Sequence, residues 1–337
     1  MLTHYYYRDL TESLRMVLLT VLPFYDVLVH LYFCEVVLID GIRFRMDSDE
    51  LSDIQSRLYK MIPKQTQDII ATAIFLVALP VGFLINIFFV MPLWYPVFGE
   101  AWWTRVSFFL FLAFNVYMNW YKMLKIGPSG LSPELPNVVK AGFRYCHSCH
   151  ANAPPRAYHC PVCDVCCFRR DHHCSFGAVC VGHFNQRYFV AAVGNLFILM
   201  IPLFSYTWEF AWTRIEGGFS LGRSWQIFLP HLALLARVIS LYQFCCIVFC
   251  ASNFTVLLFV SYLLFAQLFC IWNGQTRMEY LLEVHAYQLG LLDNLRQCLG
   301  SRWPLIFISP FITSPLPSDG MSFVTREIKE LNDPKYL

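Results

Sequence analysis

The chain has 337 residues, of which 57% are hydrophobic and only 14% are charged, and its formal net charge is +2 at neutral pH. Soluble domains carry about 25% charged residues. Such an excess of apolar residues cannot be hidden in one soluble core, so the composition predicts a membrane protein. The small net charge argues against a general nucleic-acid binder.

The first apolar stretch, Val17 to Ile39, is long enough to span about 30 Å of hydrocarbon. It carries Asp26, His30 and Glu35, and charges at membrane depth are costly and usually face protein or water. The stretch is therefore either a true span or a helix that lies at the interface or packs on the core. A further alternative is that Asp26 and His30 together bind a proton or a metal ion. Asp40 to Asp68 is polar and predicts a short surface helix with a linker.

Two apolar stretches with few polar groups follow and predict a pair of membrane-spanning helices. Ile69 to Met91 is the first, and Pro80 and Gly82 within it predict a kink. Val106 to Met123 is the second. Pro92 to Arg105, between them, is rich in tryptophan and tyrosine, which favour the membrane interface, so we expect a loop that leaves the membrane and re-enters it.

The next segment, Cys146 to Cys180, holds eight of the 14 cysteines and five of the ten histidines. Cys-x2-Cys pairs with a histidine at each break have the ligand spacing of tetrahedral zinc sites. Two such sites need eight donors, and ten candidates stand out in the segment: Cys146, Cys149, His159, Cys160, Cys163, Cys166, His172, His173, Cys174 and Cys180. The surplus pair, His172 and Cys174, stands beside Asp171, and a carboxylate, an imidazole and a thiol together can form an activated nucleophile.

The region around these residues, Lys125 to Arg187, carries seven lysines and arginines against three acidic residues. An excess of positive residues is typical of cytoplasmic loops, so we expect this region to face the cytosol. Its cysteines have metal spacing and are expected to be reduced, because disulfide frameworks belong to small secreted domains.

The full register runs from Cys146 to Asn185 as Cys-x2-Cys-x9-His-Cys-x2-Cys-x2-Cys-x4-Asp-His-His-Cys-x5-Cys-Val-Gly-x2-Asn. It resembles the cysteine-rich domain of the DHHC protein S-acyltransferases, or palmitoyltransferases, and Asp171-His172-His173-Cys174 is the motif that names that family. With the flanking apolar segments and a C-terminal motif, the resemblance covers about residues 69–320. It is closest to the branch that lacks Pro-Trp after the motif.

The resemblance implies two structural zinc ions, held in interleaved order by three cysteines and one histidine each. The first set is Cys146, Cys149, His159 and Cys166, and the second is Cys160, Cys163, His173 and Cys180. It also implies that Cys174 is the nucleophile, that His172 is the base and that Asp171 orients the imidazole. Long-chain acyl-CoA, such as palmitoyl-CoA, is then the acyl donor, and an S-acyl-Cys174 intermediate passes the chain to cysteine thiols of proteins.

Several arginines near the motif could contact the phosphates of CoA, since guanidinium groups suit phosphate. They are Arg156, Arg169 and Arg170, with Arg144 nearby. The alternative is that these basic residues only set the topology.

Two further spans are expected after the cysteine-rich segment, and Tyr188 to Trp212 is the first. The 47 residues from Gln226 to Trp272 are apolar enough for two spans. However, the family pattern places the zinc domain and the C-terminal motif on the same side of the membrane, so the number of spans between them must be even. Because one span precedes this stretch, the stretch itself must cross the membrane once or three times. We therefore expect Ile247 to Trp272 to cross the membrane. Gln226 to Cys246 then forms a helix on or partly within the far leaflet, with Arg237 at the interface.

The expected fold is an all-α integral membrane protein, a four-span helical bundle with a small cytosolic two-zinc domain between spans two and three. Residues 1–68 form an N-terminal extension with one apolar helix, and 69–124 the first two spans. Residues 125–187 form the zinc domain, 188–272 the last two spans with the interfacial helix, and 273–337 a cytosolic tail. We expect no internal repeat.

The expected partners are the lipid bilayer, acyl-CoA and protein substrates with cytosolic juxtamembrane cysteines, and the resemblance favours Golgi or endoplasmic reticulum membranes. Some family elements are altered, because Ser175-Phe176 replaces Pro-Trp and the Thr-Thr-x-Glu motif reads Thr276-Arg277-Met278-Glu279. These changes leave open a catalytically weak or silent member that acts as a membrane scaffold or adaptor. A zinc-finger nucleic-acid binder is disfavoured, since the ligands lie between membrane spans.

Arg277 stands where the family has a threonine close to the motif aspartate. An arginine can grip a carboxylate through two parallel hydrogen bonds, so its guanidinium would compete with His172 for Asp171 if it reaches that far. The alternative is that it points to lipid phosphates, as basic residues at span ends do.

Overall fold

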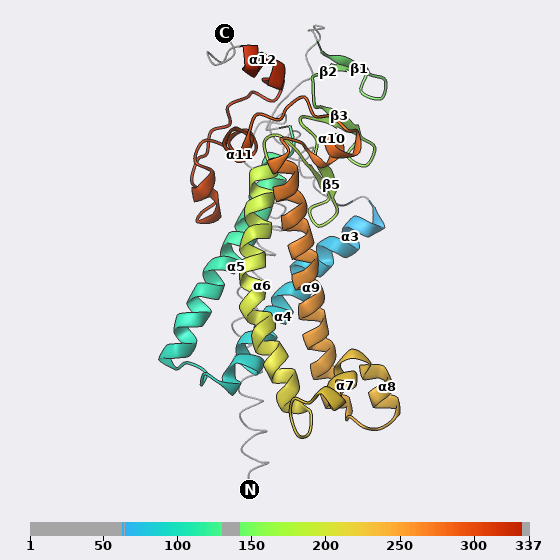
Figure 1. Cartoon of the computed structure of the whole chain (residues 1–337), viewed down its shortest axis with the longest axis vertical. Coiled ribbons are helices and arrows are strands. Elements are labelled where there is room, and N and C mark those ends of the chain that lie inside the picture. The colour runs from blue at the N-terminus through green and yellow to red at the C-terminus, as the bar shows by residue number, and fades with distance from the viewer. Residues whose placement is uncertain (1–62, 64, 130–141, 332–337) are drawn as a thin grey trace, which may run out of the picture.

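The computed structural model of the chain describes residues 63, 65–129 and 142–331. Within these residues, four long helices pack together, and short strands and the tail gather at one end of the bundle (Figure 1). The expectations for Val17–Ile39, including Asp26 and His30, and for nearly all of Asp40–Asp68 fall outside the described residues.

The first long helix runs from Thr66 to Leu93 and changes its winding along the way. It consists of α3 (Thr66–Ala73), the π-helical turn η1 (Ile74–Ala78), α4 (Leu79–Ile85), a second π-helical turn η2 (Asn86–Val90) and the 3-10 turn η3 (Met91–Leu93). Pro80 has no N–H to donate, and its ring crowds the carbonyl four residues earlier, which lies in η1. The wider π-helical turn accommodates that conflict at the place where the sequence predicts a kink.

The other long helices are α5 (Glu100–Ile126), α6 (Gln186–Arg214) and α9 (Leu241–Trp272), and α6 packs along both of the others. The first helix, α6 and α9 are long and apolar enough to cross a membrane. α5 contains the expected span Val106–Met123 but is not among these candidates. It buries the amides of Asn115 and Asn119, which donate to carbonyls four residues earlier in the same helix. The described residues thus contain three candidate spans, where four were expected.

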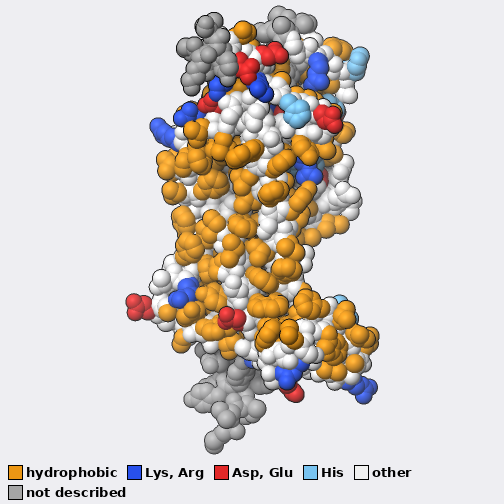
Figure 2. All heavy atoms as spheres, viewed as in Figure 1, with side chains coloured by type: hydrophobic (Ala, Val, Ile, Leu, Met, Phe, Trp, Pro, Cys, Tyr) orange, Lys and Arg blue, Asp and Glu red, His pale blue; other side chains and the backbone are white. Residues whose placement is uncertain are grey.

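An apolar belt covers the middle of the molecule, and charged side chains gather towards its two ends (Figure 2). Exposed hydrophobic side chains on the long helices make up this belt, among them Val81, Phe111, Ile198 and Phe265. A contiguous apolar surface of this kind is unfavourable in water and marks a surface that another apolar phase covers. The protein is therefore a membrane protein, as its composition predicts.

The part of the core nearest the strands joins all four long helices around a buried thiol. Phe75 of η1 packs on Trp120 of α5 with 5.4 Å between the ring centroids. Phe189 of α6 and Ile271 of α9 belong to the same cluster, and so does Cys174. The side chain of Cys174 therefore lies at the boundary between the helical bundle and the strands.

The segment between α6 and α9 lies at the end of the bundle away from the strands (Figure 1). Its elements are η4 (Leu221–Arg223), α7 (Ser224–Phe228) and α8 (Pro230–Leu235). α9 begins at Leu241, earlier than the expected Ile247, because the side chains of Ser240 and Gln243 form a capping box. The single helix expected over Gln226–Cys246 is therefore wrong, since short helices and a turn take its place.

Three short β-hairpins stand at the opposite end. The fold is therefore mostly helical, and the prediction of an all-α fold is wrong in this respect. Their antiparallel strands are β1 (Arg144–Cys146) with β2 (Ala151–Ala153), β3 (Tyr158–Cys160) with β4 (Val165–Cys167), and β5 (His172–Cys174) with β6 (Val179–Val181). Isolated two-stranded hairpins are marginally stable at best in water. These hairpins therefore need further cross-links, and the expected metal ligands lie within them.

The tail covers the same end of the bundle (Figure 1). Its elements are α10 (Arg277–Leu281), α11 (Leu291–Leu299), η5 (Trp303–Phe307) and α12 (Arg326–Leu331). α11 is flanked by Gly290 (φ +96°, ψ 155°) and Gly300 (φ +87°, ψ 175°), a backbone region that only glycine adopts readily. A Cβ at Gly290 would meet open space, whereas a Cβ at Gly300 would overlap the carbonyl group of Ser314. The lack of a side chain at Gly300 therefore lets Ser314 come close enough to donate its hydroxyl to the carbonyl of Leu299 in α11, at 2.8 Å.

Changing Gly300 to alanine should loosen the tail more than the same change at Gly290. In both variants the alanine must adopt a strained backbone conformation, which lowers the stability by about 1–3 kcal/mol. Only Gly300→Ala also displaces Ser314. Thermal unfolding of the detergent-purified protein should show a lower melting temperature for Gly300→Ala than for Gly290→Ala. Equal melting temperatures would contradict this account of the close contact.

Candidate active site and metal centres

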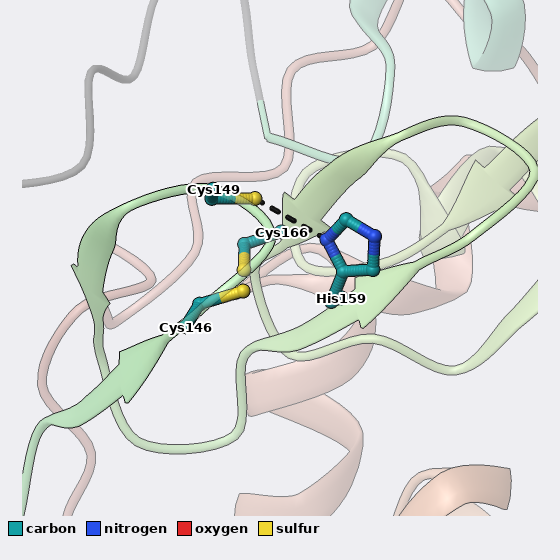
Figure 3. A group of neighbouring side chains, drawn as sticks. All are labelled: Cys146, Cys149, His159 and Cys166. Atoms are coloured by element: carbon teal, nitrogen blue, oxygen red, sulfur yellow. Dashed lines mark hydrogen bonds between the residues drawn. The ribbon is translucent and has the colours of Figure 1, made fainter.

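Two groups of side chains in the hairpins are arranged to hold a metal ion. Each combines two cysteines of a Cys-x2-Cys turn with a histidine and a cysteine that face each other across the next hairpin. The first group is Cys146, Cys149, His159 and Cys166 (Figure 3), and the second is Cys160, Cys163, His173 and Cys180. The structure thus brings together the eight residues in the two sets that the resemblance implied.

The distances within each group fit a tetrahedral zinc ion. When Zn–S bonds are about 2.3 Å long, neighbouring ligand atoms of a tetrahedron are about 3.8 Å apart. The Sγ atoms of Cys163 and Cys180 are 3.7 Å apart, and the Nδ1 atom of His173 lies 3.3 Å from Cys163 Sγ. In the first group, Cys149 Sγ lies 3.2 Å from the Nδ1 atom of His159. Four donors of this kind leave no open position, which is typical of a structural zinc site.

Asp68 of α3 holds the histidine of the second group from outside. Its Oδ2 lies 3.1 Å from His173 Nε2, and the carboxylate is almost fully buried. Because Nδ1 faces the sulfur atoms, Nε2 carries the ring proton and donates it to Asp68, an arrangement that fixes a metal-binding imidazole. In the first group, the equivalent contact to the histidine is looser. Asp164 is exposed, and its carboxylate lies 3.8 Å from His159 Nε2.

The hairpins repeat every 14 residues, so the expectation that the chain has no internal repeat is wrong. The side chains repeat, because Cys146, Cys160 and Cys174 are spaced by 14 residues and each ends the first strand of its hairpin. The backbone repeats as well, because the fourth residue after each of these cysteines has a positive φ, at His150, Asp164 and Ala178. Each repeat is therefore a strand, a tight turn and a returning strand.

Cys174 occupies in the third repeat the place that Cys146 and Cys160 occupy in the first two. The second turn cysteine, however, is replaced by Gly177, where a Cβ would lie 2.8 Å from Met123 Cε and 2.9 Å from Leu124 Cδ2. Side chains of α5 thus fill the space that a second cysteine would need. Neither metal group found in the described residues includes Cys174, and its thiol is left for other chemistry.

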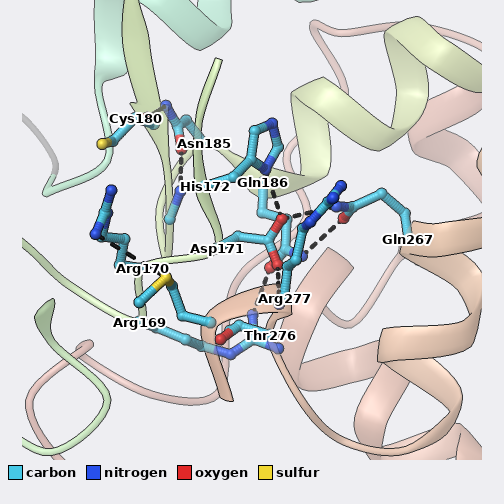
Figure 4. Close-up of polar contacts among 12 residues, drawn as sticks. Arg169, Arg170, Asp171, His172, Cys180, Asn185, Gln186, Gln267, Thr276 and Arg277 are labelled. Atoms are coloured by element: carbon cyan, nitrogen blue, oxygen red, sulfur yellow. Dashed lines mark hydrogen bonds and ion pairs between the residues drawn. The ribbon is translucent and has the colours of Figure 1, made fainter. Parts of the chain in front are cut away.

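The alternation of side chains along β5 separates the second metal group from a possible nucleophile. Successive residues of a strand point to opposite faces, so His173 faces the metal group while His172 and Cys174 share the other face. His172 Nδ1 lies 2.7 Å from Asp171 Oδ2 (Figure 4), which leaves Nε2 for the thiol. Phe189 packs edge-on against the imidazole, with 4.9 Å between the ring centroids. A thiol, an imidazole and a carboxylate in this order can generate a thiolate.

Burial and hydrogen bonding act in opposite directions on His172 and Asp171. Removal from water alone would lower the pKa of His172, but its hydrogen bond to Asp171 and the neighbouring Cys174 thiol raise the pKa to about 9. Burial alone would raise the pKa of Asp171, but the hydrogen bonds that it accepts lower the pKa. An imidazolium beside an ionised carboxylate is therefore favoured at neutral pH, and an imidazolium stabilises a neighbouring thiolate.

Three donors from separate segments converge on the Asp171 carboxylate, which has no exposed surface. His172 Nδ1 and Gln267 Nε2 both donate to Oδ2 at 2.7 Å, and the main-chain N–H of Arg277 donates to Oδ1 at 2.8 Å (Figure 4). The ion pair considered between the Arg277 guanidinium and Asp171 is wrong, because the guanidinium bonds to the Tyr262 hydroxyl at 3.3 Å. Any residue except proline can supply this main-chain N–H, so an arginine at position 277 keeps the contact.

Two of the arginines expected to contact CoA phosphates make buried contacts within the fold. Arg156 forms a fully buried ion pair with Glu279, with bonds of 2.6 and 2.7 Å that attach the tail to the hairpins. Arg169 is also buried, and it donates to Gln186 at 2.8 Å. Burial keeps both guanidinium groups away from solution. Contact of Arg156 and Arg169 with the phosphates of CoA therefore stays a prediction. Arg170 is only half-buried.

The residues that follow Cys174 are held by the bundle through their main chain. Trp120 Nε1 donates to the carbonyl of Phe176 at 3.0 Å, and Thr72 Oγ1 donates to the carbonyl of Ser175 at 3.3 Å. These contacts use carbonyl groups and do not depend on the side chains at positions 175 and 176. The turn therefore stays attached to α3 and α5 although Ser175-Phe176 replaces Pro-Trp.

Three residues of this region were missed in the sequence: Asp68, Gln186 and Gln267. All three are buried and hydrogen-bonded to the motif or its neighbours. A polar group within an apolar stretch is costly unless it is paired, and this signal could have identified Gln267 near the end of an expected span. Asp68 and Gln186 stand at the starts of helices, where polar residues are ordinary, and the sequence carries no such signal for them.

Comparison with known proteins places this region among palmitoyltransferases. The DHHC palmitoyltransferase family model matches residues 139–284. The chain is 37% identical over 225 residues to the probable palmitoyltransferase ZDHHC24 of Rattus norvegicus, which covers 61% of this chain and 76% of the relative. The Homo sapiens protein of the same name is 37% identical over 208 residues, covering 57% and 70%. The palmitoyltransferase ZDHHC15 of Homo sapiens is 26% identical over 221 residues, covering 60% and 58%.

Proposed function

Because the chain belongs to the DHHC palmitoyltransferase family, it is a protein S-acyltransferase, and we propose that it carries the acyl group on Cys174. The geometry of β5 is the observation that supports this proposal most strongly. Cys174 shares a face with His172, whose Nδ1 bonds to the buried carboxylate of Asp171 at 2.7 Å. The thiol thus has a base beside it and belongs to neither metal group of the described residues.

The first half of the proposed reaction loads the enzyme from acyl-CoA. His172 Nε2 takes the proton from Cys174 Sγ, and the thiolate attacks the carbonyl carbon of the thioester. The bond between Cys174 Sγ and the acyl carbon forms, the bond to the CoA sulfur breaks, and the imidazolium gives its proton to the leaving CoA thiolate. Asp171 remains ionised throughout and keeps the ring in place.

The second half passes the acyl group to a protein. A substrate cysteine loses its thiol proton to His172 Nε2 and attacks the thioester carbon on Cys174. The new thioester forms as the bond to Cys174 Sγ breaks, and the imidazolium returns its proton to Cys174. Because the two substrates react in turn with one residue, the kinetics are expected to be ping-pong.

A cavity of about 740 Å³ within the bundle is proposed to hold the acyl chain. Its walls are mostly apolar side chains of the first helix, α5, α6 and α9. Leu79, Val116 and Leu196 line it and also pack in the cluster that contains Cys174. An apolar space next to the cluster that contains Cys174 favours a long hydrocarbon chain over a short acyl group. This preference supports palmitoyl-CoA or a similar long-chain acyl-CoA as the donor.

We further propose that the two metal groups bind one structural zinc ion each. A bound zinc would cross-link hairpins that cannot hold themselves together, and so would contribute directly to folding. The distances between the ligand atoms and the four donors in each set support this role. Arg170, which remains half-buried beside the motif, is the arginine that we propose for contact with the CoA phosphates.

For the topology, we propose that α5 is the fourth span and that the hairpins and tail face the cytosol. The excess of positive residues in 125–187 supports the cytosolic side. The segment with α7 and α8 would then meet the far leaflet, to which it presents exposed Phe228, Leu232 and Leu235. The proposed substrates are proteins with juxtamembrane cysteines on the cytosolic side, and the proposed location is the Golgi or endoplasmic reticulum.

The alternative of a catalytically silent scaffold is not favoured, because the altered family elements keep their contacts. Thr276 and Glu279 form a capping box that starts α10, and Glu279 pairs with Arg156. The Arg277 N–H holds Asp171. The parts that position the thiol, the imidazole and the carboxylate are thus all present.

The function is tested by incubating the purified protein with palmitoyl-CoA and measuring acyl groups that hydroxylamine releases. The wild-type chain should become acylated, and Cys174→Ala should abolish the label because it removes the acceptor thiol. Cys245→Ala, which removes an exposed thiol outside the site, should keep the label. A label that persists in Cys174→Ala would contradict the proposal.

Removal of the Asp68 carboxylate should weaken the second metal site without touching a ligand. Loss of such an outer hydrogen bond typically costs about 10- to 100-fold in metal affinity. In Asp68→Ala, one of two zinc ions per chain should pass to a chelator faster than in the wild type. Asp164→Ala, which removes the exposed carboxylate of the other site, is the matched control and should release zinc at the wild-type rate. Equal release rates in both variants would refute this role for Asp68.

Replacement of Arg277 by proline tests the main-chain contact to Asp171. Arg277 is the first residue of α10, where proline fits, and Thr276 before it is extended (φ −90°, ψ 167°). Arg277→Pro therefore deletes one N–H with little other change, and the acylation rate should fall about 10- to 100-fold, as expected for a hydrogen bond to a charged group. Arg277→Thr keeps the N–H and should retain the wild-type rate. If both variants are equally active, the contact has no catalytic importance.

A further inference from the structure

A chain of buried amide side chains runs from Arg169 to the Asp171 carboxylate (Figure 4). Arg169 Nη1 donates to Gln186 Oε1 at 2.8 Å, and Gln186 Nε2 donates to Gln267 Oε1 at 2.9 Å. Gln267 Nε2 then donates to Asp171 Oδ2 at 2.7 Å. None of the four side chains is more than 4% exposed. The chain links the first residue of α6 and the cytosolic end of α9, as proposed above, to the motif.

The chemistry of the two ends fixes the direction of every bond in this chain. A guanidinium can only donate hydrogen bonds, and an ionised carboxylate can only accept them. Gln186 must therefore turn its oxygen to Arg169 and its NH2 group to Gln267. Gln267 must in turn aim its NH2 group at Asp171. A glutamine held in this way has one usable rotation of its amide, so the chain delivers an N–H to a fixed point in space.

That fixed point is the oxygen on which the imidazole depends. Asp171 Oδ2 receives both the Gln267 N–H and the His172 Nδ1–H, while Oδ1 receives the Arg277 main-chain N–H. A carboxylate with donors on both oxygens cannot rotate without breaking one of them. The rotation of the carboxylate decides where the His172 ring stands, and hence whether Nε2 faces Cys174 on the same side of β5.

We propose that Gln267 and Gln186 are positioning residues for acyl transfer, which hold the Asp171 carboxylate in the rotation that aims His172 Nε2 at Cys174. This inference rests on the proposed role of Cys174 as the acyl carrier. It assigns Arg169 to the anchoring end of the chain rather than to CoA. It also connects the packing of α6 against α9 to the active site, because the Gln186–Gln267 bond crosses between these two helices.

The decisive variant is Gln267→Met, which keeps the length of the side chain and removes both its donor and its acceptor. Loss of a hydrogen bond to a charged group predicts a fall of about 10- to 100-fold in kcat for acylation of Cys174 by palmitoyl-CoA. KM for palmitoyl-CoA and the zinc content should not change, since Gln267 touches neither the cavity wall nor a metal ligand. Gln243→Met, on the same helix at its other end, is the matched control and should keep the wild-type rate.

A double variant distinguishes a chain that acts as one unit from two independent structural bonds. Gln186→Met alone should lower kcat about 2- to 10-fold, because it leaves Gln267 in place but unsupported. In the Gln267→Met background the same change should have almost no further effect, since the connection to Asp171 is already lost. If the two effects multiply, the glutamines act separately and the inference is overturned.

The remaining outcomes separate this inference from the proposed function. Wild-type protein that takes no label from palmitoyl-CoA would refute the proposed function itself. Wild-type protein that is labelled at Cys174, with Gln267→Met labelled as fast, would overturn only the role of the glutamines. A higher KM with unchanged kcat would also overturn it. If Gln267→Met loses zinc or does not fold, the inference is tested by Gln186→Met alone. A wild-type kcat in Gln186→Met would then refute the positioning role of the two glutamines.

Discussion

The Asp171 carboxylate is the group on which the arrangement depends, because it lies where water cannot reach it and must be satisfied by the protein. Its donors come from the first residue of β5, from α9 and from the first residue of α10. A buried charge that loses part of this set costs several kcal/mol. The strand, the helix and the start of the tail are therefore held in one relative position, and the imidazole of His172 follows from that position.

The hairpins show how one structural unit can serve two purposes. The first two repeats use Cys146 and Cys160 as metal-group members, and the third keeps the same backbone turn with Cys174 at the equivalent position. The difference lies outside the repeat, because Met123 and Leu124 of α5 occupy the space beside Gly177. Contact with the bundle thus replaces the missing cross-link in the third repeat and places its thiol in the core cluster of the bundle.

Much of the site could be predicted from the sequence, since the Cys and His spacing is local and the resemblance supplied the pairing into two sets. The 14-residue spacing was equally readable but was missed, because Gly177 interrupts the ligand pattern in the third repeat. The contacts of Arg156 with Glu279 and of Gln267 with Asp171 join residues 123 and 96 positions apart. Such pairings depend on how helices pack, which spacing along the chain does not reveal. Nothing in the sequence therefore indicated that Arg156 would pair with Glu279.

The most direct test of this account is the rate of Cys174 acylation in Asp171→Asn, measured together with zinc content. An asparagine presents one oxygen and one NH2 group to three donors, so at least one donor must face another donor. The account predicts that two zinc ions per chain remain and that the rate falls about a thousandfold or more, as in other triads whose carboxylate becomes an amide. An Asp171→Asn protein that retains more than about a tenth of the wild-type rate would contradict it.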